Sequence, residues 1–157
     1  MPSVLFICTA NQIRSPLAAA LFRKELELTG TPLDEWRISS AGTWAENGLT
    51  AFPQAQYAAK ELGVNIESHR SQVVNEDLLV DHALVLTMEF GQKEALQIEF
   101  PQFAGKIYLL SEMVDQLYEI DDPVGGRRSG YDLAGRNILI IIREGLGKIT
   151  RLASSES

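Results

Sequence analysis

Short apolar runs alternate along this chain with longer segments of mixed polarity. The stretch WRISS (36–40), of mixed polarity, predicts a second strand, and the apolar runs are SVLFI (3–7), ALVLT (83–87) and KIYLL (106–110). Their length and their β-branched, aromatic and leucine side chains are typical of strands that are buried on both faces. Because strands that alternate with helices build a parallel sheet, the pattern predicts a layered α/β domain.

The first helix is predicted directly after the first strand. Ser15 is expected to cap its N-terminus, with Pro16 at the first helical position, and Gly30 is expected to end it. Its core face is expected to carry Leu17, Leu21 and Leu28.

Three more helices are predicted from spacing and from helix-ending residues. One covers about 53–62 and ends at Gly63, and a second lies near 89–99 and is stopped by Pro101. The third covers about 130–152, where one face is apolar. The residues of that face are Ile138, Ile142, Leu146 and Ile149.

Composition and charge restrict the class of protein. The chain has 157 residues, 45% hydrophobic and 22% charged, which predicts one domain over 1–153 followed by a short polar tail at 154–157. No apolar run approaches the roughly 20 residues of a membrane span, and the N-terminus lacks the basic start of a signal peptide. The net charge of −7 argues against nucleic acid or an anionic membrane as a partner.

Cysteine and histidine are scarce. One cysteine cannot form an internal disulfide, and the two histidines, His69 and His82, have no metal-ligand spacing. We therefore expect no metal and no cofactor, and a reducing, cytoplasmic location.

The stretch CTANQIRSP (8–16) carries the chemistry. Cys8 ends the first predicted strand, and a helix begins a few residues later, so the joining loop directs N–H groups and the helix dipole toward an anion. Arg14 can hold two phosphate oxygens, and the same field favours the thiolate form of Cys8. Asn11 tolerates left-handed backbone angles, and Ser15 can donate a hydrogen bond to the thiolate. The alternative is an inert core cysteine, which this specific arrangement disfavours.

The stretch resembles the active-site loop of the low-molecular-weight protein tyrosine phosphatases. SAGT (40–43), GVNIESHRS (63–71) and DDPVGG (121–126) are similar to further family motifs in the same order. The resemblance implies a three-layer α/β sandwich with a four-stranded parallel sheet flanked by helices. It also implies phosphorylated protein substrates, and we expect a monomer or a weak dimer.

The resemblance implies a role for each matching residue. Cys8 is the nucleophile, Arg14 the phosphate clamp and Asp122 the general acid, with Asp121 as an alternative acid. A hydrogen-bond network that supports the loop consists of Asn11, Ser15, Ser40 and His69. The substrate contacts are Thr9, Ala10, Asn11, Gln12, Ile13, Arg14, Ser15 and Trp44, although Trp44 is equally compatible with packing within its own loop.

Several positions depart from the family pattern. Ala10 replaces a usual glycine, Ile13 a frequent second cysteine, and Val124 and Gly125 the aromatic residues that often follow the Asp-Pro pair. Ala10 predicts a restricted loop backbone and reduced activity. Gln12 stands where tyrosine phosphatases of the family often have Ile and phosphoarginine phosphatases have Thr.

We therefore expect hydrolysis of phosphotyrosine through a phosphocysteine intermediate. Two alternatives stay open: a protein-arginine phosphatase on the same scaffold, and a phosphoanion-binding module without turnover. Thioredoxin-coupled arsenate reductases need more cysteines than the one present, and a sugar-phosphotransferase subunit needs neither Arg14 nor the Asp-Pro pair.

Overall fold

The computed structural model describes residues 1–155, in which four strands form one sheet. The strands are β1 (Ser3–Cys8), β2 (Arg37–Gly42), β3 (Leu84–Thr87) and β4 (Ile107–Leu109). Their order is β2-β1-β3-β4, and all neighbouring pairs are parallel. The predicted parallel sheet and the four predicted strands are confirmed.

Helices connect the strands. The α-helices of the described residues are α1 (Arg14–Leu28), α2 (Pro53–Glu61), α3 (Glu76–Asp81), α4 (Phe90–Glu99) and α5 (Arg128–Ala153). Short 3-10 turns are η1 (Leu33–Glu35), η2 (Pro101–Lys106) and η3 (Leu110–Val114). The predicted polar tail begins after α5, and its residues 156 and 157 lie outside the described residues.

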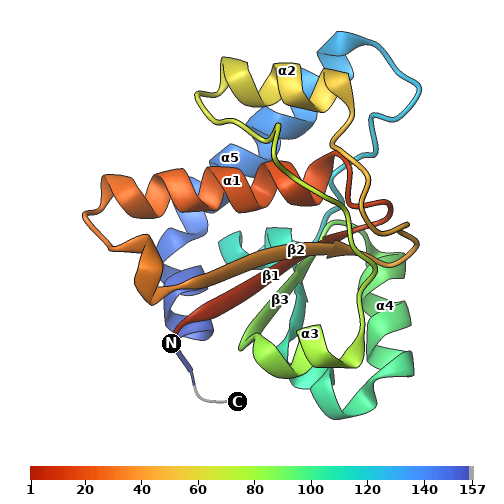
Figure 1. The fold of residues 1–157 in the computed structure, drawn as a ribbon. Helices are drawn as coiled ribbons and strands as arrows, with labels where there is room; N and C mark the ends of the chain where they lie inside the picture. Colours follow the sequence, from red (N-terminus) through yellow and green to blue (C-terminus); the bar gives the residue numbers. More distant parts are fainter. Residues whose placement is uncertain (156–157) are drawn as a thin grey trace.

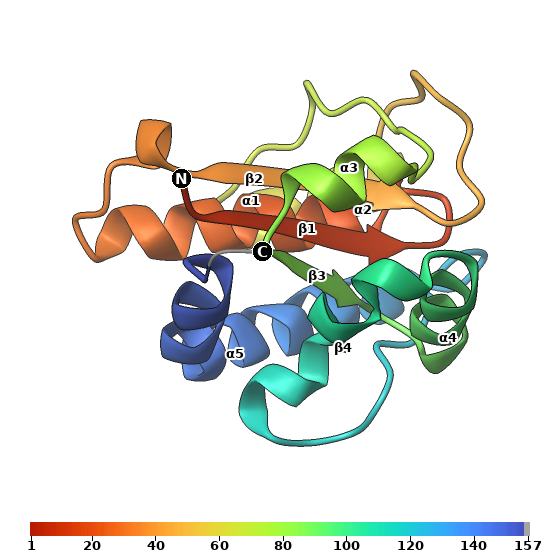
Figure 2. The ribbon, with the colours of Figure 1, turned by 90° about the horizontal axis from the view of Figure 1, so that it is seen from below.

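The elements form three layers. Helices α1 and α5 cover one face of the sheet, with α2 packed outside them, whereas α3 and α4 cover the other face (Figures 1 and 2). Alternate residues of β1 point to the two faces: Val4 and Phe6 join the core under α1 and α5, and Leu5 and Ile7 join the core over α3 and α4. Burial on both faces explains why β1 is apolar without alternation.

The start of α1 differs from the prediction. The helix begins at Arg14, Ile13 takes the N-cap position, and no side chain caps the N-terminus. Ser15 is thus the second helical residue, and Pro16 the third. The hydroxyl of Ser15 does not cap the helix because it bonds to Cys8 and Asn11 instead.

Two further predictions need correction. Leu28 is 68% exposed, because the last turn of α1 extends beyond the sheet (Figure 1), whereas Leu17 and Leu21 are fully buried. The short helix α3, capped by Asn75, was not predicted. Its six residues are too few to establish a periodic pattern.

The carboxyl ends of the parallel strands meet at one edge of the sheet. The loops after β1 and β2, the start of α4 and the segment before α5 all gather there, on the right of Figure 1. This is the edge where open α/β sheets bind ligands. None of the helices within residues 1–155 combines the length and apolarity that a membrane crossing requires.

Candidate active site

Cys8 lies at the end of β1 and is almost completely buried. Its Sγ atom is 2.9 Å from the Oγ atom of Ser15, in the first turn of α1. Ser15 Oγ accepts a hydrogen bond from Asn11, so the hydroxyl hydrogen is available for the sulfur; the other acceptor near it, the carbonyl of Ala41, is farther away at 3.4 Å. The geometry suits a hydroxyl that stabilises a thiolate.

Asn11 is the centre of the loop between β1 and α1, which we call the cysteine loop (residues 8–14). Its backbone has a φ of 59°, in the left-handed region that asparagine tolerates. Its side-chain Nδ2 donates to Ser15 Oγ at 2.8 Å and to Ser40 Oγ at 2.9 Å. Its Oδ1 accepts from the backbone N–H of Gln72 at 2.9 Å. A single side chain therefore connects β1, α1, β2 and the 65–75 loop.

His69 contacts the cysteine loop from the 65–75 loop. Its Nε2 lies 2.7 Å from the carbonyl oxygen of Asn11, and the ring is half-buried. Burial lowers the pKa of His69, the positive charges of Arg23 and Arg70 lower it further, and the hydrogen bond to Asn11 opposes both. The neutral imidazole of His69 is therefore placed to hold the cysteine loop through its hydrogen bond to Asn11.

The loop after β2 packs directly on the cysteine loop. The N–H of Thr43 donates to the carbonyl of Cys8 at 3.0 Å, and that of Trp44 donates to the carbonyl of Thr9 at 2.9 Å. A Cβ atom at Gly42 would lie 2.3 Å from the Thr9 carbonyl oxygen, so this approach requires glycine. The side chain of Trp44 is 86% exposed, which rules out packing within its own loop.

Arg14 is held rigidly although it is charged and only 1% exposed. Its Nη1 donates to the carbonyl of Ile120 at 2.7 Å and pairs with Oε2 of Glu89 at 2.6 Å. Both Nη1 hydrogens are thus occupied. The Nε and Nη2 hydrogens form the edge of the guanidinium that suits two phosphate oxygens.

Asp122 lies on that same edge of Arg14. Its Oδ2 is 3.5 Å from Nη2 of Arg14, and its side chain is 36% exposed. Its Oδ1 accepts from the N–H of Val124 at 3.1 Å, in a turn at the Asp-Pro pair. Among the described residues, Asp121 forms no ion pair with Arg14. Of the two candidate acids, Asp122 is the one that the structure brings to Arg14.

The remaining residues of the cysteine loop line its surface or its base. Gln12 turns its Nε2 to the carbonyl of Thr50 at 2.9 Å, and Ile13 is buried in the cluster beneath α2. Ala10 does not have a positive φ, so the predicted restriction of the loop backbone by its methyl group is not found. Within residues 1–155, the backbone N–H groups of residues 10–13 donate to no protein acceptor. Unpaired N–H groups in such a loop favour an anion.

Two residues that contact the cysteine loop were not identified in the sequence. Glu89 pairs with Arg14 and caps α4, and Gln92 is buried and donates from Nε2 to Oγ1 of Thr9 at 3.0 Å. The available signal was position: Glu89 comes two residues after β3, at the edge of the sheet where Cys8 lies.

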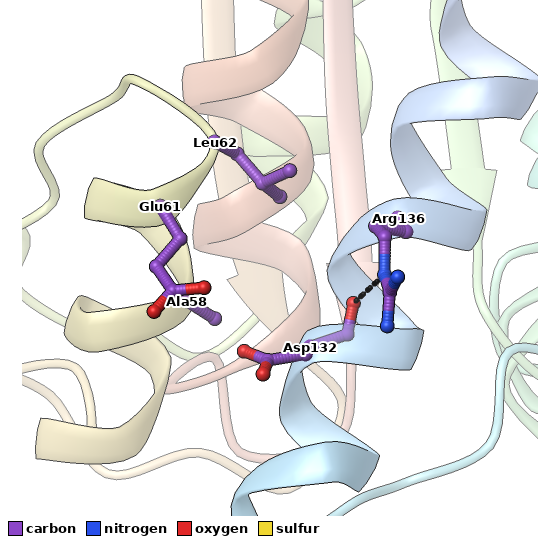
Figure 3. A pocket seen from close by; sticks show the side chains of 5 residues that line it. All are labelled: Ala58, Glu61, Leu62, Asp132 and Arg136. Carbon is purple, nitrogen blue, oxygen red and sulfur yellow. Dashed lines mark hydrogen bonds between the residues drawn. The ribbon is translucent and has the colours of Figure 1, made fainter.

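A cavity of about 280 Å³ lies between α2 and α5, away from this site (Figure 3). It is lined by Ala58, Glu61, Leu62, Asp132 and Arg136. Arg136 Nε points to the carbonyl of Asp132 at 3.4 Å, and no cysteine-loop residue lines the cavity. In the part of the chain that the structure describes, no group of three acidic, histidine or cysteine side chains is placed to hold a metal ion.

Comparison with known proteins identifies the family. Residues 3–151 match the model of the low molecular weight phosphotyrosine protein phosphatase family, and the chain belongs to this family. The fold and the site residues that motivated the resemblance therefore lie within a match that covers almost the entire chain.

Individual relatives carry two kinds of name. The chain is 33% identical over 121 residues to a probable low molecular weight protein-tyrosine-phosphatase, EpsP, of Ralstonia solanacearum, covering 77% of each chain. It is 34% identical over 132 residues to a protein-arginine-phosphatase of Geobacillus stearothermophilus, covering 83% of this chain and 84% of the relative. The crystal structure of a low molecular weight protein tyrosine phosphatase from T. tengcongensis is similar with a TM-score of 0.87 and 32% identity, covering 94% and 99% of the two chains.

Proposed function

We propose that this protein hydrolyses phosphotyrosine and similar aryl phosphates on proteins through a phosphocysteine intermediate. The observation that carries the proposal is the geometry of Arg14. One nitrogen of its guanidinium is fully engaged by Glu89 and Ile120, and the opposite edge faces Asp122. A phosphate on that edge lies between a cysteine nucleophile and a carboxylic acid, as the reaction requires.

The first step forms the S–P bond. The thiolate of Cys8 attacks phosphorus, the bond to the aryl oxygen breaks, and Asp122 donates its proton to that oxygen. Arg14 and the free N–H groups of the cysteine loop stabilise the charge on the other phosphate oxygens.

The second step hydrolyses the intermediate. The carboxylate of Asp122 takes a proton from water, which attacks phosphorus, and Cys8 leaves as a thiolate. The hydroxyl of Ser15, 2.9 Å from the sulfur, stabilises the leaving thiolate. Inorganic phosphate is released.

The test is hydrolysis of p-nitrophenyl phosphate by the wild type and by Cys8→Ser, from mildly acidic to neutral pH, with vanadate as competitor. We expect a bell-shaped pH profile, competitive inhibition by vanadate, and no turnover by Cys8→Ser. Acid quenching during turnover should trap phosphate on Cys8 in the wild type. Residual turnover near the wild-type rate in Cys8→Ser would overturn covalent catalysis by this thiol.

Phosphoarginine is the second candidate substrate. It is favoured because Val124 and Gly125 provide no aromatic wall beside the Asp-Pro pair, and because a relative at 34% identity is named a protein-arginine-phosphatase. Trp44, exposed beside the cysteine loop, supports an aryl substrate instead. The ratio of kcat/KM for a phosphotyrosine peptide to that for a phosphoarginine protein decides between the two, and a ratio well below one would reject phosphotyrosine.

The remaining alternative is a phosphoanion-binding module without turnover. Ala10 and the lack of aromatic residues at Val124 and Gly125 favour it, but the backbone of Ala10 is not in the left-handed region. A folded wild type that binds vanadate without hydrolysing any phosphate ester would restore this alternative.

We further propose that residues 1–153 act as one phosphatase domain in the cytoplasm, as a monomer or weak dimer, without a cofactor. Light scattering at micromolar concentration measures the oligomeric state.

A further inference from the structure

A polar cavity of about 300 Å³ adjoins the cysteine loop on the side of His69. None of Cys8, Arg14 and Asp122 lines it, so it is separate from the candidate active site. It lies between the first turns of α1, the end of β2 and the 65–69 loop. The polar lining residues are Arg23, Ser40, Asn65, Ser68 and His69.

The charge around this cavity is positive. Arg23 donates from Nη2 to the carbonyl of Ile38 at 2.7 Å, and it forms no ion pair with any residue among 1–155. Glu67, the acidic residue of the adjoining loop, is paired with Lys60 at 3.1 Å. The cavity therefore offers a cation that no carboxylate of the described chain neutralises.

His69 connects the cavity to the cysteine loop. The carbonyl of Asn11 can only accept, so the Nε2 of His69 carries a hydrogen and donates it at 2.7 Å. The second ring nitrogen, Nδ1, makes no hydrogen bond with any described residue. It is an acceptor in the neutral ring and a donor in the protonated ring.

We propose that this cavity binds a small oxyanion, of the class of inorganic phosphate, between Arg23, Ser68 and the protonated Nδ1 of His69. The bound anion acts on the cysteine loop, because a protonated imidazole donates a stronger hydrogen bond to the carbonyl of Asn11. The cavity is thus an effector site next to the site of the chemistry. The proposal does not depend on catalysis.

Proton and anion are linked at this site. Burial, Arg23 and Arg70 lower the pKa of His69, so the ring is neutral at pH 7 without an anion. An anion that binds the protonated ring raises the pKa of His69, and protonation raises the affinity for the anion by the same factor. For an anion of constant charge, binding should therefore weaken as the pH rises and the ring of His69 loses its proton.

The experiment is an NMR titration of the histidine rings of the full chain in the absence and presence of inorganic phosphate. The chain has two histidines, and His82, buried at the C-terminal end of α3, serves as the internal reference. The test variant is Arg23→Gln. Its matched control is Arg70→Gln, which also removes one positive charge near His69. Arg70 does not line the cavity, and its Nη1 donates to the carbonyl of His69 at 2.8 Å.

Phosphate should move the midpoint of the His69 titration to higher pH in the wild type and in Arg70→Gln, but not in Arg23→Gln. The His82 midpoint should not move in any of the three. An unmoved His69 midpoint in the wild type would overturn the proposal. An equal movement in Arg23→Gln would also overturn it, because the effect would then come from phosphate in the candidate active site.

A second variant supplies the anion covalently. Ser68→Asp places a carboxylate in the lining of the cavity, so the His69 midpoint should rise without phosphate and respond little when phosphate is added. This variant tests the site even if Arg23→Gln does not fold. A His69 midpoint in Ser68→Asp that equals the wild-type value and still responds fully to phosphate would contradict the proposed location.

Discussion

The cysteine loop and the segment that carries Asp122 differ in how firmly the structure holds them. In the cysteine loop, Asn11 and Arg14 are almost completely buried, and every polar side chain from Cys8 to Ser15 has a hydrogen-bond or ion-pair partner within the fold. In the segment of residues 121–127, which we call the acid segment, only Pro123 is buried. Within one site, the cysteine loop is therefore held more firmly by burial and polar contacts than the acid segment.

The acid segment is fixed mainly at its two ends. Before it, the N–H of Ile120 donates to the carbonyl of Met88 at 3.0 Å, and Glu119 accepts from the N–H of Phe90 at 2.9 Å. After it, Arg128 pairs with Glu61 and lies over the ring of Tyr57. A charge-stabilising loop works best when its donors are fixed before the reaction, whereas an acid must adapt to leaving groups of different size. Changes in the two regions should therefore have different signatures.

The largest effect is expected from Cys8→Ser. We expect a loss in kcat of at least about four orders of magnitude for all substrates, because the hydroxyl is a poor nucleophile at neutral pH. Vanadate or phosphate should still bind, since the cysteine loop is unchanged. Loss of anion binding together with turnover, measured by calorimetry, would mean that the loop depends on the thiolate for its shape.

Arg14→Lys should cost about a thousandfold in kcat/KM. A lysine cannot pair with Glu89, reach the carbonyl of Ile120 and hold two phosphate oxygens at once. The loss should be similar for good and poor leaving groups. Lys93→Arg serves as a control for a change of cation on α4, where Lys93 is 23% exposed and pairs with Glu112 at 2.9 Å, away from the cysteine loop, and it should retain activity.

Asp122→Asn should show the opposite pattern, a loss that depends on the leaving group. We expect about a hundredfold decrease in kcat for phenyl phosphate and a much smaller decrease for p-nitrophenyl phosphate, whose departure needs little protonation. Asp121→Asn is the matched control and should change neither rate by more than about twofold. Equal losses for both substrates in Asp122→Asn would remove Asp122 from the role of acid.

A stability difference should separate two neighbouring serines of β2. Ser40→Ala removes the hydroxyl that accepts from Nδ2 of Asn11, so we expect the free energy of unfolding to fall by about 1–2 kcal/mol and kcat to fall several-fold. Ser39→Ala removes a hydroxyl with no bond among the described residues and should be near neutral. Urea unfolding and steady-state kinetics measure both. An equal effect of the two substitutions would mean that the loss of stability comes from strand β2 and not from the hydrogen bond between Ser40 and Asn11.

The smallest effect is expected from pH. Burial lowers the pKa of both His69 and His82, so the unfolded chain binds more protons than the folded chain near the ordinary histidine value of about 6.5. The stability is complete above that value and falls as the pH drops toward the lowered folded values. Urea unfolding at pH 7.5 and pH 5.5 should show this decrease, and His82→Gln should reduce it. Equal or higher stability at pH 5.5 would contradict the shifts.

Much of the fold was predictable because it depends on local signals. The three apolar runs and the stretch 36–40 became the four strands, and the helices over 53–62, 89–99 and 130–152 were found near their predicted ends. The failures were local signals that a tertiary contact overrode. Ser15 reads as a helix cap, but its hydroxyl is used by Cys8 and Asn11.

The site was predictable only in part. The spacing from Cys8 to Arg14 is local, and the chemistry of a thiol and a guanidinium at a strand-to-helix turn follows from it. Glu89 and Gln92 were missed because each acts on the cysteine loop across more than 70 residues of chain, with no local spacing to mark the contact.

The sequence by itself determined the layered α/β class, the order of the four strands and the four longer helices along the chain, and the cysteine loop with its neighbouring helix. Each of these depends on residues that are close together in the chain. Only the tertiary structure decided the orientation of Arg14, the contact of Asp122 with its free edge, and the cavity beside His69. Those features arise where the carboxyl ends of parallel strands bring distant segments to one edge, and the packing of the sheet sets their distances.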